Sequence, residues 1–60
     1  MGDKIRALRE ARGLSQNDLA EALGINQSTV SNWERGKIEP TLFNVRRLAN
    51  ILGVEPGELF

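Results

Sequence analysis

A chain of 60 residues has room for a single small domain, residues 1–60, and a domain of this size buries only about 60% of the surface that its unfolded chain exposes. Cysteine and histidine are both absent, which excludes disulfides, the usual zinc sites and the commonest side chain for proton transfer. Eight Lys and Arg balance eight Asp and Glu, so the net charge is zero, and non-specific attraction to nucleic acid is expected to be weak. We expect no cofactor and no bound metal.

The first predicted helix lies in the charged N-terminal segment. Asp3 is placed to cap it, Ile5 and Leu8 give it an apolar side, and Gly13 ends it. This segment lacks the apolar centre of a signal peptide, and no later stretch approaches the roughly 20 apolar residues of a membrane span. We therefore expect a cytoplasmic protein that does not bind a membrane.

A second helix is predicted over residues 16–23. Ser15 stands at the N-cap position, and Asp18 follows three residues later as the acid of a capping box. Gly24 ends the helix, because the residue after a helix end often needs a positive φ angle that only glycine adopts without strain.

A third helix is predicted over residues 27–34, directly after the turn at Gly24. Asn26 is the expected N-cap, and Ile25 and Val30 form a hydrophobic staple. The two helix starts are eleven residues apart, which leaves room for about two helical turns and a sharp change of direction. Two short capped helices joined in this way predict a helix-turn-helix, a motif that lays one helix against DNA.

The remainder of the chain predicts two more helices. A loop ends at Pro40, Thr41 caps a fourth helix, and Gly53 closes it. Glu55 and Pro56 suit the N-cap and first position of a last helix. The chain is therefore expected to be all-α, with five helices. One apolar face of the fourth helix is formed by Leu42, Val45, Leu48, Ala49 and Leu52.

A long, ordered set of residue types runs through the helix-turn-helix segment and the fourth helix: Leu14, Ser15, Gln16, Leu19, Ala20, Gly24, Ser28, Val30, Ser31, Trp33, Glu34, Gly36, Pro40, Leu48, Ala49, Leu52, Gly53 and Val54. With these residues in register, residues 4–59 resemble the DNA-binding domain of the lambdoid phage repressor and Cro family, also called the XRE-type helix-turn-helix family. The resemblance implies a compact five-helix, lambda-repressor-like domain. It also implies sequence-specific binding of double-stranded DNA by a transcriptional regulator, most often a repressor, with the third helix in the major groove.

Uncharged polar side chains occupy the expected outer face of the third helix. Amide side chains can bond the N6 and N7 edge of adenine in a bidentate manner, and Ser can bond either type of base. By similarity to phage repressors, we expect base contacts from Gln27, Ser28 and Asn32, with Asn26 and Ser31 as further candidates. The amides predict A·T base pairs at the Gln27 and Asn32 contacts.

Phosphate contacts are expected from residues that flank the third helix. Gln16 stands at the start of the second helix, where its side chain and the free amides can meet a phosphate oxygen, and the resemblance gives it this role. Arg35 and Lys37 follow the third helix, and the amide of Phe43 lies at the start of the fourth.

The resemblance further implies an ion pair and a dimer. Arg9 and Glu34 match the positions of a partly buried salt bridge that ties the first helix to the third. Val54, Leu59 and Phe60 lie in the region that forms the dimer interface in the family. We expect a weak homodimer that DNA strengthens, on an operator with two half-sites about one DNA turn apart.

Two other functions stay open at this point. The chain could be the antitoxin of a toxin-antitoxin pair, which represses its own promoter and binds a toxin as partner. It could instead be a helix-turn-helix that binds only a protein effector, and the neutral charge favours this reading. An enzyme is not expected, because the chain has no nucleophile paired with a base, no metal-binding cluster and no phosphate-binding glycine loop.

Overall fold

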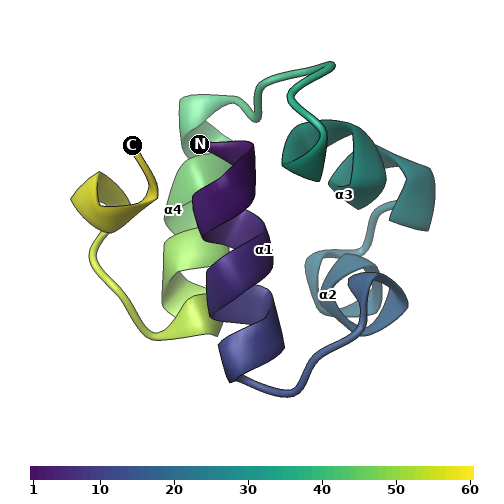
Figure 1. Ribbon diagram of the computed structural model, residues 1–60, viewed down its shortest axis with the longest axis horizontal. Helices are drawn as coiled ribbons and strands as arrows, with labels where there is room; N and C mark the ends of the chain where they lie inside the picture. The colour runs from purple at the N-terminus through teal and green to yellow at the C-terminus, as the bar shows by residue number, and fades with distance from the viewer.

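The computed structural model describes residues 1–60 as four α-helices and a final 3-10 turn, without strands. Helices α1 and α4 stand together, α2 and α3 lie to one side of them, and the 3-10 turn η1 lies on the other side (Figure 1). The predicted all-α class and the bounds predicted for the second and third helices are confirmed. The elements are α1 (Gly2–Ala11), α2 (Gln16–Leu23), α3 (Gln27–Glu34), α4 (Leu42–Leu52) and η1 (Pro56–Leu59).

Four of the five predicted helices are α-helices, and the last element is a single 3-10 turn. Glu55 is its N-cap and Pro56 stands at its start, as expected. Its backbone hydrogen bonds span three residues rather than four, from Glu58 N–H to Glu55 O at 2.9 Å and from Phe60 N–H to Gly57 O at 3.4 Å.

Two helix starts are fixed by the side chains that the sequence predicts. Ser15 and Asp18 form a complete capping box: Asp18 N–H donates to Ser15 Oγ, and Ser15 N–H donates to Asp18 Oδ2, each at 2.9 Å. Thr41 caps α4, where its Oγ1 accepts the N–H of Asn44 at 3.3 Å. These bonds satisfy backbone donors that a helix leaves free in its first turn.

The predicted cap of the first helix is wrong. Helix α1 begins at Gly2 with Met1 as N-cap, and Asp3 lies inside the first turn. The carbonyl oxygen of Met1 already accepts backbone N–H groups of the first turn. The start of α1 also packs closely on the end of α3: a Cβ atom on Gly2 would lie 2.5 Å from the backbone oxygens of Trp33 and Glu34, so this position requires glycine.

The start of α3 has the predicted N-cap residue but not the predicted side-chain bond. Asn26 has the extended backbone of an N-cap, and its side chain makes no cap hydrogen bond. The backbone oxygen of Asn26 accepts the N–H of Thr29 at 3.0 Å. Burial holds the entry to the helix instead, since Val30 is fully buried and Ile25 packs against the core.

The turn between α2 and α3 is built as the sequence predicts. Gly24 adopts a left-handed conformation with φ 71°, and the N–H of Ile25 bonds the carbonyl oxygen of Ala20 at 3.0 Å. Ala20 is buried, and α2 packs against α3 more extensively than any other pair of helices. The small Ala20 side chain permits this close crossing, which fixes the direction of α3.

One hydrophobic core unites all five elements. Leu59 belongs to it with no exposed surface, so the expectation that this residue forms a dimer interface is wrong: its side chain anchors η1 to the rest of the protein. No helix is both long and apolar enough to cross a membrane. The core consists of Ile5, Leu19, Ala20, Leu23, Val30, Trp33, Val45, Leu48, Ala49, Leu52 and Leu59.

Candidate nucleic-acid interface

Helix α3 has one buried and one accessible side. Val30, Trp33 and Glu34 are buried. The predicted base-contacting residues lie elsewhere on the helix: Asn26, Gln27 and Ser28 are exposed, and Ser31 and Asn32 are half-buried. The last four of these recur at positions i, i+1, i+4 and i+5, which is one face of a helix. This accessible face therefore carries hydroxyl and amide groups and no charge of its own.

The back of α3 is held by the ion pair that the resemblance implies. The Arg9 guanidinium donates from Nε to Glu34 Oε2 at 2.7 Å and from a terminal nitrogen to Glu34 Oε1 at 3.0 Å. A third N–H of Arg9 donates to the backbone oxygen of Leu14 at 2.7 Å. Arg9 is 8% and Glu34 2% exposed, so a desolvated, bidentate pair joins α1 to α3.

Sequence reasoning missed the further hydrogen bonds of Glu34. Gln16 Nε2 donates to Glu34 Oε1 at 3.0 Å, and Arg6 Nε approaches the same oxygen at 3.4 Å. Gln16 Oε1 in turn accepts the Nε2 N–H of Gln27 at 3.5 Å. A chain of bonds thus runs from Arg9 through Glu34 and Gln16 to the first residue of α3. No sequence pattern marks these bonds, because the partners are separated by 11 to 28 residues.

The charges of this network shift both of its principal pKa values. Burial alone would raise the pKa of Glu34, but the hydrogen bonds from Arg9, Gln16 and Arg6 and the charge of Arg9 outweigh it and lower the pKa. The hydrogen bond to Glu34 raises the pKa of Arg9, against a smaller opposing effect of burial. Both groups are therefore held in their charged forms.

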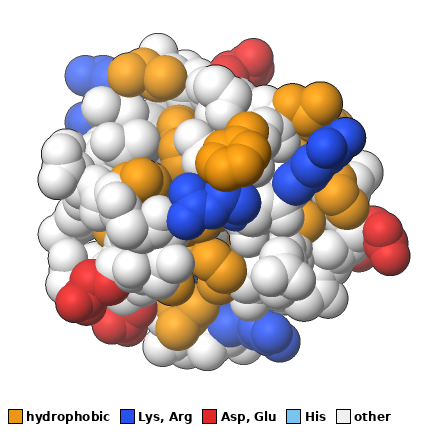
Figure 2. Space-filling view, turned by 180° about the vertical axis from the view of Figure 1, so that it is seen from behind, with side chains coloured by type: hydrophobic (Ala, Val, Ile, Leu, Met, Phe, Trp, Pro, Cys, Tyr) orange, Lys and Arg blue, Asp and Glu red, His pale blue; other side chains and the backbone are white.

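Most basic side chains are engaged within the protein. On the face seen in Figure 2 they are scattered among apolar and acidic groups instead of forming one basic surface. Six of the eight Lys and Arg side chains hydrogen-bond to other groups of the chain. The acceptors are Glu34 for Arg6 and Arg9, backbone oxygens for Lys4, Arg12 and Arg47, and Asn32 for Arg35.

The expected phosphate contacts surround α3 at its two ends. Gln16 is half-buried beside the start of α3, and Arg35 and Lys37 are exposed just after its end. Phe43 lies at the start of α4 with its side chain 70% exposed, and the guanidinium of Arg47 lies 5.5 Å from its ring centre. The backbone amide of Phe43 belongs to the first turn of α4, where backbone N–H groups have no helical acceptor.

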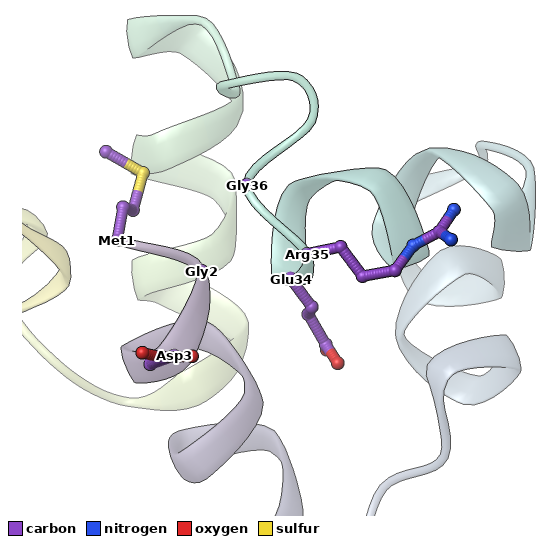
Figure 3. Close-up of a pocket in the computed structure, with 6 residues that line it drawn as sticks. All are labelled: Met1, Gly2, Asp3, Glu34, Arg35 and Gly36. Carbon is purple, nitrogen blue, oxygen red and sulfur yellow. The ribbon is translucent and has the colours of Figure 1, made fainter.

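A hollow lies beside the contact between the start of α1 and the end of α3 (Figure 3). The Glu34 side chain points away from it between the helices, and the Arg35 side chain extends in another direction, across α3. The hollow holds about 230 Å³ and is lined by Met1, Gly2, Asp3, Glu34, Arg35 and Gly36. Its lining is mostly polar backbone and charged groups, so it is not an apolar ligand pocket.

Known proteins match nearly the whole chain. Residues 5–59 match the family model described as helix-turn-helix. The prophage-derived HTH-type transcriptional regulator YonR of Bacillus subtilis is 40% identical over 53 residues, which is 88% of this chain and 49% of YonR. The phage CTXphi transcriptional repressor RstR of Vibrio cholerae is 39% identical over 56 residues, which is 93% of this chain and 50% of RstR. The chain thus spans about half the length of these two relatives, and 21% of another.

A solved structure shows the same fold. The crystal structure of the restriction-modification controller protein C.AhdI from Aeromonas hydrophila matches with a TM-score of 0.91 and 46% sequence identity, over 98% of this chain and 89% of that one. The fold, the family match and the accessible polar face of α3 agree with one another. The chain belongs to the helix-turn-helix family of DNA-binding transcriptional regulators.

Proposed function

We propose that this chain binds double-stranded DNA in a sequence-specific manner as the DNA-binding part of a transcriptional repressor, with α3 in the major groove. The observation that carries the proposal is the two-sided character of α3. Its inner side is fixed by the core and by the buried Arg9–Glu34 pair, and its outer side offers amides and hydroxyls. A rigid helix with hydrogen-bonding groups on its free face suits the direct readout of base edges.

In this arrangement Gln27, Ser28 and Asn32 contact base edges, with Asn26 and Ser31 beside them. Gln27 is suited to adenine. It donates one Nε2 N–H to Gln16, which leaves its Oε1 and the second N–H free for the N6 and N7 edge of the base. Repression is supported by the name of RstR, a transcriptional repressor that is 39% identical to this chain.

The phosphate contacts proposed here use few charges. Gln16 and the amide of Phe43 offer neutral donors, and Arg35 and Lys37 offer exposed cations just after α3. Each cation that meets a phosphate contributes about −0.9 to the slope of log affinity against log salt concentration. We therefore expect a slope of about −2 per protomer, which is shallow for a DNA-binding protein because the other basic side chains are mostly engaged internally.

We further propose that two copies bind one operator. Phe60 is 61% exposed and Val54 is half-buried at the same end of the chain, so these two side chains are available for a homodimer contact while Leu59 is not. A small contact of this kind gives a weak dimer in solution and a stronger one on DNA, where each copy holds a half-site.

Selection of bound duplexes from a random pool, followed by a salt titration, tests this function. The expected result is a two-fold symmetric consensus and a slope of about −2 per protomer. Lys37→Met is the matched control: it should reduce the slope by about 0.9 per protomer and leave the consensus unchanged. A pool from which no sequence is enriched would overturn the proposed function.

A further inference from the structure

A hydrogen bond at the end of α3 joins a proposed base-reading residue to a proposed phosphate-binding residue. A terminal guanidinium nitrogen of Arg35 donates to Asn32 Oδ1 at 2.9 Å. We propose that Arg35 sets the base preference of Asn32, so that the two side chains together favour guanine over adenine. This inference rests on the proposed function, and it changes the preference for A·T that the sequence suggests at Asn32.

The chemistry of the two groups fixes how the Asn32 amide is turned. A guanidinium has only N–H donors and no acceptor, so the amide atom that faces it must be the oxygen. The free end of the Asn32 side chain is then the Nδ2 amino group, which is a donor. The remaining N–H groups of Arg35 lie beside it and are donors too.

The backbone holds both side chains in place. The oxygen of Asn32 accepts the N–H of Lys37 at 2.9 Å and that of Ile38 at 3.4 Å, and Arg35 N–H donates to Ser31 O at 3.0 Å. Arg35 keeps a helical backbone with φ −86° and ψ −4°, so residues 32 and 35 face the same way, one turn apart. Figure 3 shows the Arg35 side chain running across α3 instead of into the hollow beside it.

The two purines differ in what they offer such a pair of donors. Adenine presents the N7 acceptor next to the N6 amino donor, whereas guanine presents two acceptors, N7 and O6. An asparagine reads adenine with its oxygen and its amino group together. Arg35 takes one of the two lone pairs of that oxygen and places positive charge beside the other. The N6 amino group of adenine therefore meets a weakened acceptor next to further N–H donors. Guanine meets no such conflict, because either of its two acceptors can take an N–H from Asn32 Nδ2.

Gln27 and Asn32 use opposite ends of their amide groups in their bonds to neighbouring side chains. Gln27 uses an N–H in its bond to Gln16, so its oxygen stays free. Asn32 uses its oxygen in its bond to Arg35, and its amino group is the part of the amide that this bond leaves free. Two amide residues on the same helix face are therefore prepared for different bases by the neighbours that they contact.

The experiment measures affinities for the duplex selected by the unmodified protein and for duplexes changed at single base pairs. The pair read by Asn32 is the one at which Asn32→Ala no longer discriminates. We expect the unmodified protein to prefer guanine to adenine there by about tenfold. Arg35→Met should bring this ratio to one or below, because the amide oxygen then accepts from adenine with no guanidinium charge beside it. Thermal melts of Arg35→Met should match those of the unmodified protein, since the side chain is exposed.

Two controls separate this role from a simple phosphate contact. Lys37→Met removes a nearby cation, so it should weaken binding to both duplexes equally and keep the ratio. In an Asn32→Ala background, Arg35→Met should no longer affect one duplex more than the other, because Arg35 acts through Asn32. The proposal is overturned if the unmodified protein prefers adenine, if Arg35→Met lowers both affinities by the same factor, or if Asn32→Ala leaves discrimination intact at every pair. An enriched consensus alongside any of these results leaves the proposed function standing.

Discussion

Replacing Glu34 with alanine is expected to lower the free energy of unfolding by about 3–5 kcal/mol. The substitution leaves the buried Arg9 guanidinium without its bidentate partner, and removes the acceptor of Gln16. Urea unfolding followed by circular dichroism measures the loss. Glu10→Ala is the matched control, because Glu10 is exposed and only 4.0 Å from Arg9, a pair expected to contribute about 0–1 kcal/mol. Equal unfolding curves for the two variants would contradict a stabilising role for the Glu34 pair.

If the Glu34→Ala variant does not fold, the milder variant Glu34→Gln tests the same ion pair. The folded protein holds the pKa of Glu34 below its ordinary value of 4.5. A lowered carboxyl pKa contributes stability that is present above the unfolded value and is lost as the pH falls through the folded value. The unmodified protein should therefore lose stability below about pH 4.5, and Glu34→Gln should lose less. Part of the acid effect should persist in the variant, because hydrogen bonds from the Ser15 backbone and side chain also lower the pKa of Asp18.

Replacing Gln27 with alanine is expected to weaken binding to the selected duplex by about ten- to a hundredfold. The variant loses the proposed bidentate contact and should no longer distinguish adenine at one base pair. The slope of log affinity against log salt should not change, because no charge is removed. Fluorescence anisotropy with labelled duplexes measures both quantities.

The matched control for Gln27→Ala is Asn50→Ala. This substitution also removes an exposed amide, but on α4, away from the face of α3. It should leave affinity and discrimination unchanged. If Gln27→Ala binds the selected duplex as tightly as Asn50→Ala does, Gln27 is not a base-reading residue.

Local signals in the sequence were sufficient to locate the helix-turn-helix. The bounds of α2 and α3 follow from Ser15, Asp18 and Gly24, because caps and left-handed turns are decided by a few neighbouring residues. The start of α1 could not be predicted in the same way. The sequence offers Asp3 as a capping side chain, but Met1 takes the N-cap position without a side-chain bond, and no local pattern reveals this earlier start.

The candidate site, too, could be predicted from the sequence only in part. Residue type and helical spacing identified which side chains of α3 are accessible, and the family resemblance supplied the Arg9–Glu34 pair. The bonds that orient Gln16 and Asn32 were not predicted, because they depend on side-chain positions that only the packed helices fix. Leu59 was misplaced because an apolar residue near a chain end suits a core or an interface equally well, and burial decides between them.

The proposed function depends above all on α3 lying in the major groove. The most direct test is to replace purines of the selected half-site with 7-deaza analogues, which lack the N7 acceptor of the major groove, and with 3-deazaadenine, which lacks the N3 acceptor of the minor groove. We expect loss of N7 at the contacted purines to weaken binding by about tenfold or more, while loss of N3 has no effect. Binding that depends on N3 and tolerates the loss of every N7 would contradict a major-groove position for α3.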